Sequence, residues 1–269
     1  MDESQTPRQD TGNSRVTIWA LADIHASPLD DSGRPEKPMH IFGPQWENHI
    51  DRIESAWQGL VGEEDTVIVA GDLDWSLKLP GAIPTLKRLA TWKGDKILVR
   101  GNHDYWWSSG ATGKVRAVLP DGIRLLHNNA FQVEDFNIVG CKGSPVPGGP
   151  EWTDIDAKLL NRETERLKLS LAARDVSLPS IVALHYPPLS SNGGPTPYTQ
   201  FFAESGVKLC VYGHLHAEAS RAAVEGGHGG VEYRLVAADH VGFRPVPIGR
   251  AGVILAGDEI TTDAGRPNR

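Results

Sequence analysis

Residues 66–72 read Thr-Val-Ile-Val-Ala-Gly-Asp, a short apolar run that ends in glycine and aspartate. An apolar run of this length, rich in Val and Ile, is typical of a strand that is buried on both faces of a sheet. The same pattern, with Asp, Asn or His after the run, recurs at 16–23, 96–103, 181–185 and 208–214. We therefore predict buried strands over 16–21, 66–70, 96–99, 181–184 and 208–212, each followed closely by polar side chains.

Helical patterns lie between these strands. Apolar or small residues recur at the spacing of one helix face at positions 50, 53, 57 and 60, and again at 160, 164, 167 and 171. Shorter strand patterns at 123–126, 131–133, 136–139 and 231–237 indicate additional sheet with some antiparallel pairing. The sequence thus predicts an α/β fold in which two mixed β-sheets pack together and are flanked by helices.

The composition is that of an ordinary folded protein. Of the 269 residues, 39% are hydrophobic and 23% are charged, which argues against a disordered or fibrous chain. The 27 Lys and Arg residues against 34 Asp and Glu residues give a net charge of −7. This balance argues against an extended surface for nucleic acid or for an anionic membrane, but it does not exclude bound metal ions.

The length and the ends of the chain favour one domain. We expect a single domain over residues 15–257, with a disordered N-terminal tail over 1–14 and a flexible C-terminal tail over 258–269. The first 15 residues resemble no signal peptide, and no apolar run has the roughly 20 residues of a membrane helix. Cys141 and Cys210 are too few for a disulfide framework, so we expect a cytoplasmic protein. The sequence does not predict the oligomeric state.

Seven potential metal ligands follow the five predicted strands. Because the carboxyl ends of strands in an open α/β sheet meet at one edge, residues far apart in sequence should gather there. Their oxygens and imidazole nitrogens suit Mn²⁺, Fe, Zn²⁺ or Ni²⁺, and we expect Mn²⁺ first. The set exceeds the needs of one tetrahedral ion, whereas a shared Asp72 would give each of two ions four protein ligands. The residues are Asp23, His25, Asp72, Asn102, His185, His214 and His216.

The order of these motifs resembles the calcineurin-like metallophosphoesterase family. Five blocks carry the resemblance, and they span most of the chain. They are Asp23-Ile24-His25, Gly71-Asp72, Gly101-Asn102-His103-Asp104, the isolated His185, and Gly213-His214-Leu215-His216. Each block alone is a weak signal, but all five occur in the family's order and each follows a predicted strand.

The resemblance implies a fold, a division of the ligands and a catalytic residue. The family fold is a four-layer α/β/β/α sandwich. By the resemblance, one metal is held by Asp23, His25, Asp72 and His216, and the other by Asp72, Asn102, His185 and His214. His103 matches the histidine that contacts the phosphoryl group and protonates the leaving oxygen, and it is not a metal ligand.

A mechanism follows from the charge of a phosphoester. Two cations would neutralise the phosphoryl oxygens and lower the pKa of a bound water, so a bridging hydroxide is the expected nucleophile. His103 would then act as the general acid. Asp74 and Asp104 are candidates for orienting the His103 ring, and each could equally stabilise a turn.

Three functions remain open from the sequence. We rank first a phosphoesterase for a small or nucleotide-like substrate, second a nuclease that uses the same site, and third a non-catalytic metal-binding module. The presence of His103 favours catalysis, and the acidic balance disfavours the nuclease. Asp74-Trp75 stands where protein phosphatases of this family carry Asp-Arg, and Trp75 stands where purple acid phosphatases carry a metal-bound tyrosine. The usual glycine after the first block is replaced by Ala26-Ser27, which opens a long connection over 27–45.

Overall fold

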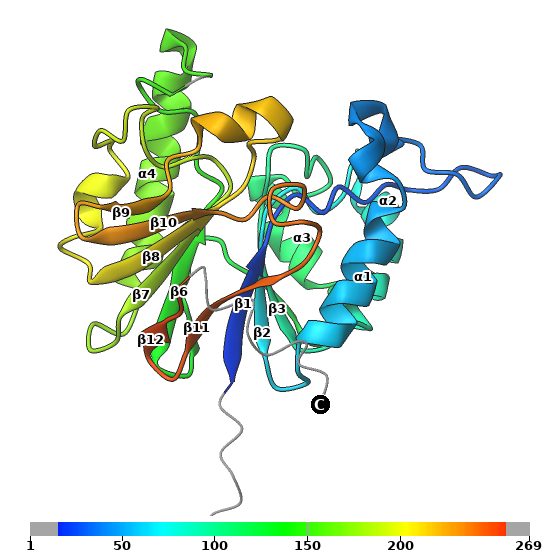
Figure 1. Cartoon of the computed structure of the whole chain (residues 1–269), viewed down its shortest axis with the longest axis horizontal. Helices are drawn as coiled ribbons and strands as arrows, with labels where there is room; N and C mark the ends of the chain where they lie inside the picture. Colours follow the sequence, from blue (N-terminus) through cyan, green and yellow to red (C-terminus); the bar gives the residue numbers. More distant parts are fainter. Residues whose placement is uncertain (1–15, 150, 257–269) are drawn as a thin grey trace, which may run out of the picture.

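Two six-stranded β-sheets pack face to face, with helices on both outer sides (Figure 1). The computed structural model describes residues 16–149 and 151–256, so the tails predicted over 1–14 and 258–269 lie outside the described residues. No helix in the described ranges is long and apolar enough to cross a membrane.

The first sheet has the strand order β12-β11-β1-β2-β3-β4. Strands β1 to β4 run parallel to one another, whereas β11 is antiparallel to both β1 and β12. The strands are β1 (Thr17–Leu21), β2 (Thr66–Ala70), β3 (Asp95–Val99), β4 (Ile123–Leu125), β11 (Val246–Arg250) and β12 (Val253–Ile254).

The second sheet has the strand order β5-β6-β7-β8-β10-β9. The four central strands are parallel, and the two edge strands pair antiparallel with them. The strands are β5 (Phe131–Val133), β6 (Phe136–Cys141), β7 (Ser180–Leu184), β8 (Val207–Tyr212), β9 (Gly226–His228) and β10 (Val231–Leu235).

Helices cover the outer face of each sheet. Figure 1 shows α1 and α2 beside the first sheet and α4 beside the second. The α-helices are α1 (His49–Leu60), α2 (Leu79–Ala90), α3 (Thr112–Arg116) and α4 (Ala157–Ala172). Short 3-10 helices lie in the connections: η1 (Met39–Phe42), η2 (Pro44–Trp46), η3 (Ser109–Ala111), η4 (Asp154–Asp156), η5 (Thr199–Phe201) and η6 (Ala217–Ala222).

The alternation of side chains along β1 explains the layering. Ile18 and Ala20 face the second sheet and join the core between the sheets, whereas Trp19 and Leu21 face the helices and join the outer core. Successive side chains of a strand point to opposite faces, so a strand packed on both faces needs an apolar residue at every position. This arrangement confirms the predicted α/β fold of two packed mixed sheets flanked by helices.

The parallel strands of both sheets end at a common edge. The N–H of Asp23, which follows β1, donates a hydrogen bond to the C=O of Gly71, which follows β2, at 2.9 Å. The chain after β1 also bonds to the segment after β10, where Ala22 N–H donates to Val236 C=O at 2.8 Å. Residues that follow strands of different sheets are thereby brought side by side.

Candidate metal centre

All seven predicted metal ligands lie at this common edge. Four of the residues at the strand ends, Asp23, His25, Asp72 and His214, have φ between 51° and 74°. Non-glycine residues rarely adopt this left-handed conformation, and when they do it is often at functional sites. The tight turns after the strands direct their side chains toward one another.

Glycines in the motifs allow the predicted ligands to approach the backbone. A Cβ atom at Gly101 would overlap the carboxylate of Asp72, and one at Gly213 would overlap the carboxylate of Asp23. Any larger residue would therefore displace a carboxylate from the site. The glycines before Asn102 and His214 in the sequence have this steric explanation.

One group of donors is formed by Asp23, His25 and His216. The Nε2 atom of His216 lies 3.3 Å from Oδ1 of Asp23 and 3.3 Å from Nε2 of His25. The three donor atoms lie within 4.8 Å of one another. This separation is that of ligands around a single ion.

A second group gathers around Asn102. Its Oδ1 lies 2.6 Å from Nε2 of His185 and 2.9 Å from Nδ1 of His214. Oδ2 of Asp72 is 3.5 Å from Nε2 of His185 and 3.8 Å from Nε2 of His25. Asp72 therefore lies between the two groups of donors.

The donor set fits divalent metal ions. Asp23 and Asp72 are buried, and Oδ1 of Asp23 accepts no hydrogen bond from the described residues. Burial, together with the charges of Asp104 and Asp23, raises the pKa of Asp72 well above its ordinary value. Bound cations would compensate for the cost of burying these carboxylates. Burial lowers the pKa values of His25 and His185 well below the ordinary value, so both rings are neutral at pH 7, as metal binding requires.

Three histidines are oriented by acceptors on their far side. Nδ1 of His185 donates to the carbonyl oxygen of Ala70 at 3.0 Å, and Nδ1 of His216 donates to Asp239 at 2.8 Å. Nε2 of His214 bonds to Glu151 at 2.8 Å. These bonds fix which ring nitrogen carries the proton and leave the opposite nitrogen facing the site.

Sequence reasoning missed Asp239 and Glu151. Asp239 follows the strand pattern at 231–237 just as the predicted ligands follow theirs, so the same rule could have found it. Glu151 lies in a connection far from any strand, and nothing in the local sequence links it to His214. Only the fold brings it to His214.

We expect Asp239→Asn to weaken metal binding by about 10- to 100-fold, because the amide orients His216 less firmly and makes it a weaker ligand. Titration of the metal-stripped variant with Mn²⁺ measures the change. Asp121→Asn, at an exposed position, is the matched control. An unchanged affinity in Asp239→Asn would show that this carboxylate does not act through the metal ligand.

Metal affinity should also rise with pH. Burial lowers the pKa of His216, but the charges and hydrogen bonds of Asp23 and Asp239 outweigh this and raise it to about 10. Below that pH a metal ion must displace a proton from His216, so affinity should increase by up to about tenfold per pH unit between pH 7 and 9. Calorimetric titration in buffers of different ionisation enthalpy counts the released protons, and release of none would contradict this expectation.

His103 lies beside the donor groups rather than among them. Its backbone N–H donates to Oδ1 of Asp72 at 2.8 Å, and its Nε2 lies 4.0 Å from Oδ2 of the same residue. The ring packs on Trp75 at a centroid distance of 4.1 Å, and Nδ1 lies 3.0 Å from the hydroxyl of Tyr105. The side chain is 32% exposed, so a substrate can reach it.

Of the two roles considered for Asp74 and Asp104, the hydrogen bonds favour the stabilisation of turns over the orientation of His103. The carboxylate of Asp104 is buried and accepts hydrogen bonds from the backbone N–H groups of Asp72, Leu73, Asp74 and Gly101 and from the indole of Trp106. The carboxylate of Asp74 accepts from Ser76 N–H and from the Thr85 hydroxyl. Neither contacts the His103 ring. Asp104 joins the loops after β2 and β3, and Asp74 stabilises a turn.

The neighbouring aromatic residues divide between core and site. Trp106 and Trp107 are buried in the outer core of the first sheet. Trp75 is partly buried and stacks on His25 at 4.9 Å, and Tyr105 is half exposed. Core packing thus explains two of the four aromatic residues near the motifs, and the other two border His103.

The fold and this cluster define a class, the α/β proteins that carry metal-binding side chains at the carboxyl ends of their strands. The family model for calcineurin-like phosphoesterases matches residues 16–218, and the chain belongs to this family. Members of the family are metal-dependent hydrolases of phosphoesters. No curated protein matches the chain.

Two solved structures are similar in fold. Phosphopantetheinyl hydrolase from Mycobacterium tuberculosis has 15% sequence identity and a TM-score of 0.55, with 83% of this chain and 89% of that chain covered. A protein of unknown function from Aquifex aeolicus has 13% identity and a TM-score of 0.47, with coverage of 86% and 95%. At these identities the similarity concerns the fold alone.

Proposed function

We propose that the protein hydrolyses a small phosphomonoester or phosphodiester, including nucleotide-like esters, with two divalent ions at the described edge. The observation that supports this proposal most is the position of Asp72. One of its carboxylate oxygens lies between His25 and His185, which belong to different donor groups. A carboxylate in that position can serve both ions.

The proposed ligand division is the one that the family resemblance implies, and Asp23 also groups with Asp72 and His185. Asp23, His25, Asp72 and His216 would hold one ion, and Asp72, Asn102, His185 and His214 the other. The mixed oxygen and nitrogen donors suit Mn²⁺ first, with Fe, Zn²⁺ or Ni²⁺ as alternatives. When bound, the ions would supply positive charge for the phosphoryl oxygens and lower the pKa of a water between them.

His103 supplies the proton in this proposal. The oxygen of water forms a bond to phosphorus and releases one proton to solvent, the ester P–O bond breaks, and the departing oxygen takes a proton from the His103 imidazolium. Burial and the charge of His214 lower the pKa of His103 to about 4 in the free protein, so its ring is neutral at pH 7. The anionic phosphoryl group of a bound substrate would favour the imidazolium, so we place its formation in the substrate complex.

Turnover by metal-stripped protein tests this function. The substrates are phosphomonoesters, cyclic nucleotides and single-stranded DNA, each assayed after addition of Mn²⁺, Ni²⁺ or Zn²⁺. We expect hydrolysis of one or more small esters only with metal present. Metal-independent turnover, or no turnover of any small ester in the metal-loaded protein, would contradict the proposal.

One observation favours the alternative of a nuclease. Arg162 and Arg166 both approach the buried carboxylate of Glu163, and the charges of Arg100 and Arg162 act on Lys142. Arg162 and Arg166 thus both pair with one carboxylate, and Arg162, which is 59% exposed, presents its charge to solvent although the whole chain is acidic. A local group of this kind could contact the phosphates of a nucleic acid strand.

Salt separates the two functions. Binding of a strand that neutralises several phosphates weakens steeply as salt concentration rises, whereas a small ester held mainly by two ions depends on it less. We expect KM for the best small ester to change by less than about threefold between 50 and 200 mM NaCl. DNA cleavage whose apparent affinity falls by about 10³-fold over this range would favour the nuclease.

The cysteines bear on the location of the protein. Cys141 and Cys210 are both buried and form no disulfide. A reducing compartment is the usual setting for free thiols. We therefore retain the cytoplasm as the proposed location.

A further inference from the structure

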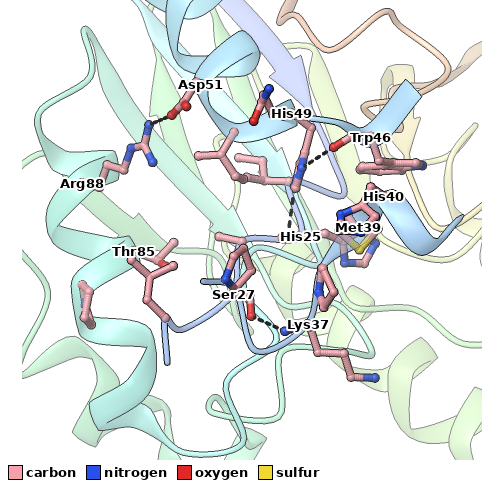
Figure 2. A pocket seen from close by; sticks show the side chains of 18 of the residues that line it. His25, Ser27, Lys37, Met39, His40, Trp46, His49, Asp51, Thr85 and Arg88 are labelled. Carbon is pink, nitrogen blue, oxygen red and sulfur yellow. Dashed lines mark hydrogen bonds and ion pairs between the residues drawn. The ribbon is translucent and has the colours of Figure 1, made fainter. Parts of the chain in front are cut away.

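A large cavity lies next to the metal centre, beneath residues 27–48, which we call the 27–48 segment. Its volume is about 660 Å³, and its other walls come from α1, α2 and the residues that follow β1 (Figure 2). This volume falls within the range of cavities that bind small organic molecules. The segment that covers it begins at Ala26-Ser27, where the family's usual glycine is replaced.

The walls of the cavity are mainly apolar. Trp46 and Met39 come from the 27–48 segment, Ile50 from α1, Leu89 from α2 and Trp92 from the turn after α2. Such walls favour hydrocarbon or aromatic groups, because burying apolar surface is the main source of binding free energy there.

Several polar side chains in the walls already have partners within the protein. The Ser27 hydroxyl accepts from Lys37 N–H at 2.9 Å, and Thr85 donates to Asp74. The ring nitrogens of His49 lie 3.0 and 3.3 Å from the carbonyl oxygens of Trp46 and His25, and the protonated nitrogen donates to one of them. These groups are engaged, and Arg88 pairs with Asp51 and Glu54. His40, Glu47 and Asn48 also line the cavity and form no side-chain hydrogen bond with the described residues, so the preference for an apolar group rests on the apolar walls.

One end of the cavity adjoins the proposed reaction site. His25 and Lys37 both line the cavity, and the Lys37 ammonium lies 4.7 Å from the centroid of Trp75. Trp75 packs on His103 at 4.1 Å. A positive charge thus stands at the junction between apolar walls and the phosphoryl site, which matches a molecule with an anionic head and an apolar body.

The apolar surface continues to the outside. Leu29 lines the cavity and is 64% exposed, and Ile41 and Phe42 of η1 are 64% and 55% exposed. Exposed apolar side chains that adjoin a cavity often mark the entry of an apolar ligand.

We propose that the cavity beneath the 27–48 segment binds the organic group of the substrate, and that this group is an alkyl chain or an aryl ring rather than a sugar or a nucleoside. This inference rests on the proposed phosphoesterase function and specifies its substrate class. Lys37 stands where the phosphoryl head and the apolar body of that substrate meet.

A series of linear alkyl phosphates from ethyl to octyl tests the substrate class. The leaving alcohols have nearly equal acidity, so differences in kcat/KM report binding of the chain. Full burial of each additional methylene would raise kcat/KM about fourfold. We expect kcat/KM to rise at least about tenfold across the whole series. A flat series, or a higher kcat/KM for a nucleoside monophosphate than for octyl phosphate, would overturn the inference.

Variants locate the effect in this cavity. Ile50→Trp adds bulk from α1, and Met39→Trp adds it from the 27–48 segment. Each should cut kcat/KM for octyl phosphate about tenfold and leave that for ethyl phosphate within about twofold. Leu169→Trp, at an exposed position of α4, is the control. Because Ile50 is only partly buried, the Ile50→Trp variant should fold and can be assayed even if Met39→Trp fails to fold.

Binding of phosphonates separates this inference from the proposed function. Octylphosphonate and methylphosphonate are not hydrolysed, so calorimetry measures their affinities without turnover. We expect octylphosphonate to bind at least about tenfold tighter, and Ile50→Trp to abolish the difference. If that holds but no ester is hydrolysed, the phosphoesterase function fails and the cavity assignment stands. If both phosphonates bind equally while esters are hydrolysed, the cavity assignment fails alone.

Discussion

Replacing Asp72 by Asn should remove at least about 1000-fold of kcat/KM and weaken both metal positions together. The carboxylate lies between the two donor groups, 3.5 Å from His185 and 3.8 Å from His25. A neutral amide can still accept the His103 N–H bond, so the backbone around it should persist. Activity should fall because the amide lacks the negative charge that holds the ions, and the ions activate the attacking water.

Metal analysis and kinetics of the same preparation measure this effect. His25→Ala should reduce occupancy mainly at one position, because its ring nitrogen groups with donors of Asp23 and His216. Asp121→Asn is again the control. Full occupancy of both positions in Asp72→Asn, or normal turnover, would contradict a shared role for this carboxylate.

His103→Ala should leave the metal content intact and reduce kcat by about 10²- to 10⁴-fold for esters with alkoxide leaving groups. The loss should be smaller for activated aryl esters, because an aryloxide leaves with little need of a proton. The ratio of the losses therefore tests proton transfer more directly than either rate.

The pattern of losses assigns the role of His103. Equal losses on both ester classes would indicate electrostatic stabilisation of the phosphoryl oxygens instead of proton donation. No loss on either class, with both ions bound, would remove the catalytic role and favour a metal-binding module. His228→Ala, on the edge strand β9, is the control for a histidine outside the site.

Much of the fold could be predicted because buried parallel strands have a plain sequence signature. The strands over 66–70 and 131–133 were predicted with their observed bounds, and the other predicted strands agree within one or two residues at an end. β9, β11 and β12 were missed, since Gly226–His228 and Val246–Arg250 lack a continuous apolar run. Such short strands take their stability from pairing with a neighbour, as β11 does with β1, and this leaves little local signal.

The candidate site could be predicted where a polar residue follows a buried strand. The rule that polar residues follow strands found seven donors and would also have found Asp239. It could not separate Asp104 from a catalytic group, because the five hydrogen bonds of Asp104 come from segments joined only in the fold. The cavity could not be predicted from the sequence either, because its walls depend on how residues 27–48 pack over α1 and α2.

Anomalous scattering from crystals grown with saturating Mn²⁺ tests the two-metal site most directly. We expect two manganese peaks about 3.5–4 Å apart, with the carboxylate of Asp72 in contact with both. His216 should contact one ion, and Asn102 the other. A single peak under saturating metal, with Asp72 contacting no ion, would contradict the proposed centre.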